Sequence, residues 1–152
     1  MKTIKTEPFC VIGISVRTTN ENGQGAIDIG GLWGRFFSEQ VLEAIPNKVD
    51  NVIYSIYTEY EQDHTRPYTT IIGCRVEHLD EIPSGMKGIR IEGGTYAQLS
   101  ARGDMQQGFV GSKWYEIWNS DLNRAYTADY EVYGEKAHNP ADAEVDFLIA
   151  IK

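Results

Sequence analysis

The chain has 152 residues, of which 41% are hydrophobic and 24% are charged. This is the composition of an ordinary soluble globular protein, and the length is most simply one domain with its own core. The formal net charge is −8. Such a charge repels phosphate backbones and therefore argues against direct nucleic acid binding.

Signals for secretion, membrane insertion and disulfide bonding are weak in this sequence. The first residues lack the apolar core of a signal peptide, and no apolar run approaches the roughly 20 residues that cross a bilayer. Cys10 and Cys74 lie in apolar, strand-like runs and are expected to be reduced thiols. We therefore expect a cytoplasmic protein that makes no membrane contact.

Apolar periodicity in the first half predicts a strand, a helix and a hairpin, over residues 9–16, 28–45 and 51–77. Asp28 can cap the helix, and Pro46 ends it. The following polar segment holds Pro83 and Gly85 and can join two halves of the chain.

The second half repeats this order of elements. Strands, a helix and two closing strands are predicted over residues 88–91, 95–101, 103–122, 130–133 and 145–151. Each half, about 1–80 and 81–152, is thus a βαββ unit. Two such units predict an α+β fold in which one antiparallel sheet carries two helices on one face, with a ligand groove between them.

The segment from Asp129 to Tyr133 combines one central carboxylate with aromatic residues. Because side chains alternate along a strand, Glu131 and Tyr133 share one face, and Tyr130 and Val132 share the other. Aromatic faces attract flat cations, and a carboxylate supplies a countercharge that strengthens when water is excluded. The segment therefore predicts a cation-binding site, with a solvated edge-strand carboxylate as the alternative.

A combination of segments along nearly the full chain carries a family resemblance. They are Phe9–Gly13, Leu32-Trp33, Gly93–Ala97, Ile117-Trp118, Tyr130–Tyr133 and Asp146–Ile149. Through them the chain resembles the GyrI-like small-molecule-binding domain, which is the effector-binding domain of multidrug-responsive activators of the AraC and MerR types.

In that family a strand-borne glutamate lies in the pocket between the helices and contacts cationic drugs, and Glu131 matches it best. The resemblance implies that aromatic residues line the same pocket, and the positions carried over are Trp33, Tyr54, Tyr96, Trp118, Tyr133 and Phe147. Trp114 shares a helix face with Trp118, and one of the two is expected to pack in the core. We prefer Trp118 for the pocket because it is equivalent to Trp33 in the other half.

No helix-turn-helix pattern is present, so the resemblance implies a stand-alone member of the family. Such members include drug-sequestering proteins, integron cassette proteins of mobile elements, gyrase-inhibitor relatives and some hydrolases of electrophilic small molecules.

Other motifs give no support for a cofactor or a metal. The glycines from Gly23 to Gly31 lack the Walker lysine and the dinucleotide-binding spacing. His64, His78 and His138 form no metal-spaced cluster.

The leading hypothesis is a binding protein for lipophilic, aromatic, cationic small molecules, with no cofactor. One alternative is a hydrolase in which Glu131 acts as general base on water. Another is a regulator that binds a protein partner, and a homodimer is also open.

Overall fold

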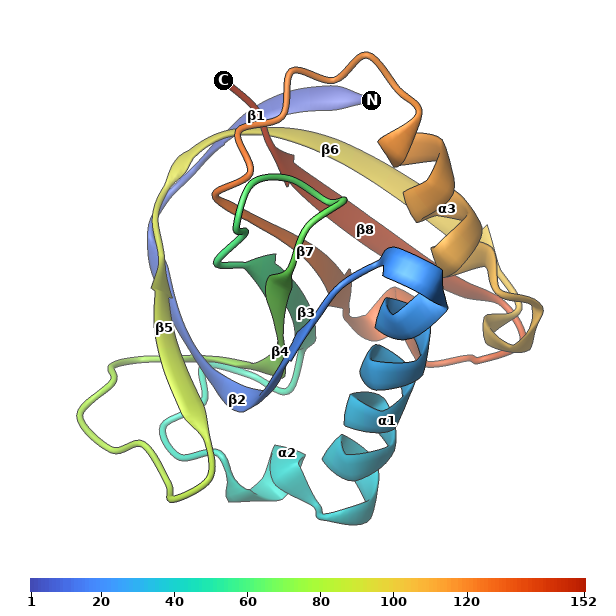
Figure 1. Ribbon diagram of the computed structural model, residues 1–152. Helices are drawn as coiled ribbons and strands as arrows, with labels where there is room; N and C mark the ends of the chain where they lie inside the picture. Colours follow the sequence, from blue (N-terminus) through green and yellow to red (C-terminus); the bar gives the residue numbers. More distant parts are fainter.

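The computed structural model describes residues 1–152 and contains eight strands in one sheet, with all neighbouring strands antiparallel (Figure 1). The strands are β1 (Lys2–Thr6), β2 (Phe9–Thr18), β3 (Ile53–Thr58), β4 (Tyr68–Val76), β5 (Lys87–Ile91), β6 (Gly94–Gly103), β7 (Ala128–Tyr133) and β8 (Ala143–Ala150). The helices are α1 (Gln24–Ser38), α2 (Val41–Ala44) and α3 (Phe109–Trp118), with short 3-10 turns η1 (Glu21–Gly23), η2 (Met105–Gln107) and η3 (Glu135–Ala137). The predicted α+β class is confirmed.

The strand order shows the two half-repeats directly. It runs β1-β6-β8-β7-β3-β4-β2-β5, and exchanging β1–β4 with β5–β8 gives the same order read backwards. The halves meet at the pairing of β3 with β7, in the middle of the sheet. The predicted pair of half-repeats is therefore confirmed, with β1 as an additional strand that the polar N-terminal sequence did not reveal.

The ends of the sheet are joined by two long, bent strands. Lys2 of β1 pairs with Gln98 of β6, and Gly13 of β2 pairs with Lys87 of β5. Both pairings have the same register, so β1 and β2 together run antiparallel to β5 and β6 together without a shift. Since β1 continues into β2 and β5 into β6, the sheet curls on itself. Gly93 lies at the bend, where an added Cβ would approach the Thr6 carbonyl oxygen to 2.4 Å, so the crossing requires glycine.

An apolar cluster fills the inside of this curled sheet. Its fully buried members come from both halves and are Val11, Ile56, Ile71, Ile91, Tyr96, Ala128, Tyr130, Leu148 and Ala150. Burial without a covering helix follows from the curl, because each strand's inner face packs against other strands. The helices lie on the other, outer face (Figure 1).

Each helix packs on its own half of the outer face. Leu32 and Phe36 of α1 join a cluster with Ile12 and Ile72 of the sheet, and in the second half Ile117 of α3 joins the cluster that includes Phe147 and Val145. The central strands β3 and β7 lie between these two covered regions, which leaves room for a groove above them.

The predicted helix boundaries were wrong in both halves: α3 covers Phe109–Trp118 and not 103–122, and α1 differs at both ends. α1 begins at Gln24, not after a cap at Asp28, whose carboxylate instead accepts hydrogen bonds from Thr18 Oγ1 and Gln24 Nε2 at 2.8 Å. The helix also stops at Ser38, because Gln40 has a φ of 52° and the chain restarts as α2. No helix of the structure combines the length and hydropathy needed to cross a membrane.

Candidate functional site

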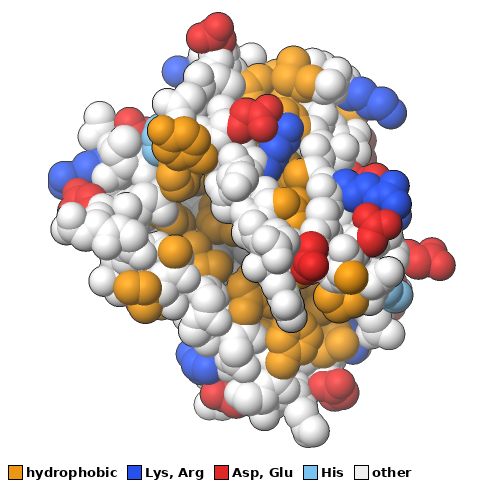
Figure 2. Space-filling view, turned by 90° about the vertical axis from the view of Figure 1, so that its right-hand side faces the viewer, with side chains coloured by type: hydrophobic (Ala, Val, Ile, Leu, Met, Phe, Trp, Pro, Cys, Tyr) orange, Lys and Arg blue, Asp and Glu red, His pale blue; other side chains and the backbone are white.

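A cavity of about 760 Å³ opens between α1 and α3, above the central strands. Of the 26 residues that line it, 15 are hydrophobic. Figure 2 shows hydrophobic side chains gathered around the hollow on this face of the molecule. This size and lining suit a drug-sized, largely apolar ligand.

Helical spacing sets the two side walls. Ile29, Trp33 and Phe37 follow one another at four-residue intervals on α1, and Val110, Trp114 and Trp118 do so on α3. Residues four apart lie on the same helix face, so each helix presents a continuous apolar stripe to the cavity. The other stripe of each helix packs on the sheet, as Leu32, Phe36 and Ile117 show.

Strand alternation sets the floor. Glu131 of β7 lies opposite Ser55 of β3, and Tyr133 and Tyr57 follow two positions along on their strands. All four therefore share the outer face. Tyr130 lies among the residues inside the curled sheet, and the predicted division of the Asp129–Tyr133 segment between two faces is confirmed.

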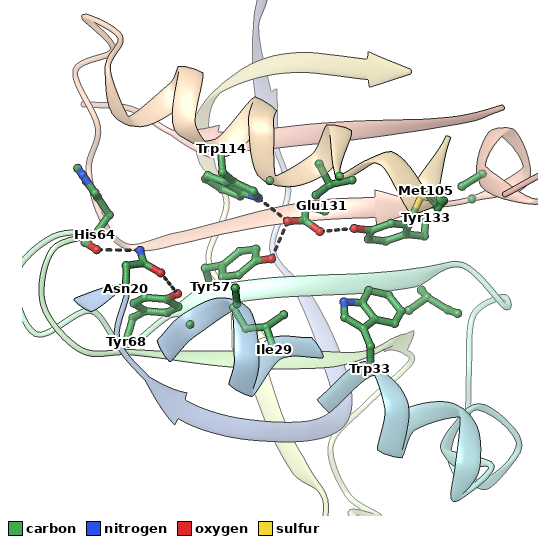
Figure 3. A pocket seen from close by; sticks show the side chains of 18 of the residues that line it. Asn20, Ile29, Trp33, Tyr57, His64, Tyr68, Met105, Trp114, Glu131 and Tyr133 are labelled. Carbon is green, nitrogen blue, oxygen red and sulfur yellow. Dashed lines mark hydrogen bonds between the residues drawn. The ribbon is translucent and has the colours of Figure 1, made fainter. Parts of the chain in front are cut away.

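Glu131 is buried, with 1% of its surface exposed, and accepts hydrogen bonds from three neutral donors. Tyr57 donates its hydroxyl to Oε2 at 2.6 Å, Trp114 donates its indole N–H to the same oxygen, and Tyr133 donates its hydroxyl to Oε1 (Figure 3). None of the ten ion pairs in the structure includes Glu131. This carboxylate has hydrogen-bond donors but no countercharge.

Burial raises the pKa of Glu131 above its ordinary value, and the hydrogen bonds from Tyr133, Tyr57 and Trp114 oppose that shift. Burial also holds the pKa values of Tyr57 and Tyr133 well above the ordinary tyrosine value, and the nearby Glu131 charge adds to it. Both phenols therefore remain protonated donors. An incoming cation would favour the ionised form of Glu131.

A second buried carboxylate, Asp129, lies two residues earlier on the same face of β7. It accepts hydrogen bonds from Arg124 Nη2 at 2.7 Å, from the Tyr60 hydroxyl at 2.6 Å and from the Ala150 backbone N–H at 2.8 Å. The Arg124 guanidinium carbon lies 4.3 Å from the ring centre of Tyr126. Arg124 also lines the cavity.

Three loops close one end of the cavity around His64. Its imidazole is stacked on Trp118, with ring centres 5.4 Å apart and planes 6° apart. Its backbone oxygen accepts a hydrogen bond from Asn20 Nδ2 at 2.9 Å, and its Nδ1 lies 3.2 Å from the Tyr126 hydroxyl. Burial, and then the charge of Arg124, lower the pKa of His64, which favours the neutral ring.

The structure brings four of the seven residues predicted for the pocket into its lining. These are Glu131, Trp33, Trp118 and Tyr133. Trp33 meets Tyr133 edge to face, with ring centres 4.9 Å apart, so these two aromatic residues form one corner of the cavity.

The other three predicted residues lie outside the lining, and their assignment to it was wrong. Tyr54 pairs with Val132, on the opposite face from Glu131, and packs against the cluster inside the curled sheet. Tyr96 belongs to that same cluster and donates its hydroxyl to the Ala128 carbonyl oxygen at 2.9 Å. Phe147 does share the face of Glu131, but it is fully buried beneath Trp114, with ring centres 5.5 Å apart.

The pocket also contains residues that the sequence did not identify. Trp114 lines the cavity together with Trp118, although only one of them was expected there. Their four-residue spacing already placed them on one helix face, and this signal would have justified including both. Tyr57 and Tyr68 also line the pocket, and Tyr57 could be found only once the register of β3 against β7 was known.

Comparison with known proteins agrees with this geometry. Residues 3–151 match the family described as Cass2, integron-associated effector binding protein. The chain belongs to the Cass2 family. This confirms the kinship with effector-binding domains that the sequence indicated.

Members and structural neighbours of this family align over most of their lengths. YobU of Bacillus subtilis (strain 168), named as a candidate transcriptional regulator, is 29% identical over 149 residues, covering 92% of this chain and 90% of YobU. The integron cassette protein VCH_CASS2 of Vibrio cholerae is 31% identical, with a TM-score of 0.75 over 99% of this chain and 95% of that one. SAV2435, solved bound to tetraphenylphosphonium, has a TM-score of 0.76 at 16% identity, over 99% of this chain and 93% of SAV2435.

The Cass2-family chain shows no constellation for metal chemistry. No group of three His, Cys, Asp or Glu side chains is placed to hold a metal ion. Cys74 is buried, and burial raises the pKa of its thiol to about 11, so it is not a thiolate at neutral pH. The cavity lining carries one carboxylate, Glu131, together with Arg124, two histidines and aromatic side chains.

Proposed function

We propose that this protein binds lipophilic, aromatic, cationic small molecules in the cavity between α1 and α3. One observation carries the proposal: Glu131 is a buried carboxylate with three neutral donors and no countercharge, in the floor of an otherwise largely apolar cavity. A buried charge without a partner is costly, and a ligand cation would offset that cost.

Three kinds of interaction would contribute to binding. Apolar burial against the helix stripes stabilises the complex by roughly 25 cal/mol per Å² of buried apolar surface. Trp33, Trp114 and Tyr57 offer ring faces or edges for stacking and cation–π contact. Attraction to Glu131 gains strength because this carboxylate is buried, where charges are screened less than in water.

The hydrogen bonds to Glu131 favour binding over the hydrolase alternative. Tyr57 and Trp114 donate to Oε2 and Tyr133 donates to Oε1, so both oxygens are held by neutral donors. A general base must present an oxygen to the water whose proton it accepts, and both oxygens of Glu131 already accept from side chains. A protein of the same fold, SAV2435, was solved with an aromatic cation of the class proposed here.

The test compares tetraphenylphosphonium with tetraphenylborate, which has nearly the same shape and the opposite charge. Calorimetry should show binding of the cation and not of the anion. Glu131→Gln keeps the side-chain shape and should weaken tetraphenylphosphonium by at least about 2 kcal/mol, or roughly 30-fold. The matched control Glu116→Gln removes an exposed carboxylate of α3 and should leave the affinity unchanged. Equal affinity of wild type and Glu131→Gln for the cation would contradict the proposal.

A further inference from the structure

Arg124 is a buried arginine in the wall of the cavity with only part of its hydrogen-bonding capacity used. It is 6% exposed, and its Nη2 donates to Asp129 and lies 3.5 Å from the Tyr60 hydroxyl. Its Nε and Nη1 are buried and have no hydrogen-bond partner. Buried donors without partners are rare in proteins, because each one loses its hydration without compensation.

The rings beside Arg124 do not supply the missing acceptors. Tyr126 lies with its ring centre 4.3 Å from the guanidinium carbon and Trp114 lies at 5.9 Å. A ring face attracts the cation as a whole but is a weaker partner for an N–H than an oxygen acceptor. The cavity is the space beside Arg124 from which an acceptor can arrive.

Trp114 fixes the position of this site relative to Glu131. Its indole N–H donates to Glu131, while its ring lies beside Arg124. Glu131 therefore lies at the N–H edge of the indole ring, and Arg124 lies over the ring. Asp129 and Glu131 are two residues apart on β7, about 7 Å by strand rise, and Arg124 is bound to Asp129, so the guanidinium and the Glu131 carboxylate are separated by about the width of a bicyclic ring.

From these contacts the geometry points to Arg124 as a specificity-determining residue that donates hydrogen bonds to an acceptor on the ligand, one bicyclic ring away from the ligand's cationic centre. This inference rests on the proposed function. Because Nε and Nη1 are buried, the guanidinium or the Tyr126 ring would have to rotate for a ligand acceptor to reach them.

The charges around Arg124 determine whether the hydrogen-bond acceptor on the ligand is neutral or charged. Asp129 already offsets the charge of Arg124, so two carboxylates and one guanidinium leave one negative charge around the cavity. A cationic ligand with a neutral acceptor brings that total to zero, whereas a ligand carboxylate would leave a negative charge buried. The ligand class is therefore an aromatic cation with a carbonyl or similar neutral oxygen, and not a zwitterion.

A matched pair of probes tests this directly. We would measure the affinities of 6-acetyl-1-methylquinolinium and 6-isopropenyl-1-methylquinolinium, which share ring, charge and shape and differ by a carbonyl oxygen in place of a methylene. Wild type should bind the acetyl probe at least about tenfold more tightly, as expected for a hydrogen bond to a charged donor.

Two variants test whether Arg124 causes the difference in affinity between the two probes. Arg124→Lys keeps a cation opposite Asp129 but removes Nε and Nη1, so the ratio of the two affinities should fall to about one, whatever the variant does to the affinity of the isopropenyl probe itself. Thr70→Val is the control, because Thr70 Oγ1 is the other buried atom without a partner and Thr70 is not in the cavity lining. It should retain the preference. Thermal melts confirm that both variants fold, and the wild-type ratio stands independently of them.

The outcomes separate this inference from the proposed function. Equal, measurable affinity of wild type for the two probes would overturn the role of Arg124 and leave cation binding standing. A preference that persists in folded Arg124→Lys would also overturn it. If wild type bound neither these probes nor tetraphenylphosphonium, the proposed function would fail, and this inference with it.

Discussion

Asp129 and Glu131 are two buried carboxylates on the same face of one strand, two residues apart, yet only one of them has a neighbouring cation. Asp129 is paired with Arg124 at 2.7 Å, and Glu131 has no cation. Both accept from a tyrosine hydroxyl at 2.6 Å, Tyr60 for Asp129 and Tyr57 for Glu131. The fold thus supplies its own cation to Asp129 and none to Glu131, which is the arrangement expected if a ligand cation pairs with Glu131.

The surroundings of the two groups agree with this division. Asp129 also accepts the backbone N–H of Ala150, so it ties β7 to the end of β8 and to the segment that carries Arg124. Glu131 accepts only from side chains that line the cavity. We therefore expect Asp129 to matter for stability and Glu131 to matter for binding.

The largest expected effect is on stability, from breaking the internal ion pair. Arg124→Met leaves Asp129 buried without its cation and should lower the free energy of unfolding by about 3–5 kcal/mol, measured by urea denaturation. Arg102→Met, which breaks the exposed pair with Asp142, is the control and should change stability little. A small loss of unfolding free energy in Arg124→Met would contradict a structural role for the Asp129–Arg124 ion pair.

The second effect is the pH dependence of stability at Glu131. Because burial raises the folded-state pKa of Glu131, its contribution favours folding below the unfolded pKa and is lost as pH rises through the folded pKa. The glutamine in Glu131→Gln does not titrate, so the variant does not lose stability in this way as pH rises. In denaturation curves at several pH values, the variant should match wild type in acid and become more stable relative to it towards neutral pH. A variant less stable than wild type at neutral pH would contradict the absence of a countercharge.

The smallest effects come from the matched tyrosines. Tyr60→Phe removes a donor to Asp129 and should cost about 1 kcal/mol of stability, but it keeps the ring that lines the cavity and should change the affinity for tetraphenylphosphonium little. Tyr57→Phe removes a donor to Glu131, so it should raise the pKa of that carboxyl further and weaken the cation several-fold near that pKa. Melting curves and calorimetry on both variants test these two roles. A loss of affinity in Tyr60→Phe together with a loss of stability alone in Tyr57→Phe would contradict the assignment of Asp129 to stability and Glu131 to binding.

Much of this fold follows from local patterns in the sequence. Four-residue spacing predicted the helix stripes around Trp33 and Trp118, and strand alternation placed Glu131 and Tyr133 on one face. The carboxylate amid aromatic residues already predicted a cation site at Glu131, and the family resemblance implied the same residue. These features depend on neighbours within one element, which is why the sequence reveals them.

The remaining features depend on contacts between distant segments. Tyr54 was carried over through the resemblance, but it pairs with Val132 and so lies on the opposite face from Glu131; which face a strand residue takes depends on the register with its neighbour. Phe147 has the right face but lies under Trp114, a contact between a strand and a helix. The internal pairing of Asp129 with Arg124 joins a strand to an irregular segment, and no spacing rule predicts it.

Proton release on ligand binding tests the central claim most directly, because it reports the charge of Glu131 itself. Tetraphenylphosphonium should be titrated by calorimetry in buffers of different ionisation enthalpy, from the ordinary glutamate pKa of about 4.3 up to the highest pH at which the protein stays folded. If the cation is neutralised by Glu131, wild type should release protons in the part of this range near the raised pKa, and Glu131→Gln should release none. Tight binding to wild type with no proton release at any pH in this range, or equal release from both proteins, would contradict the account.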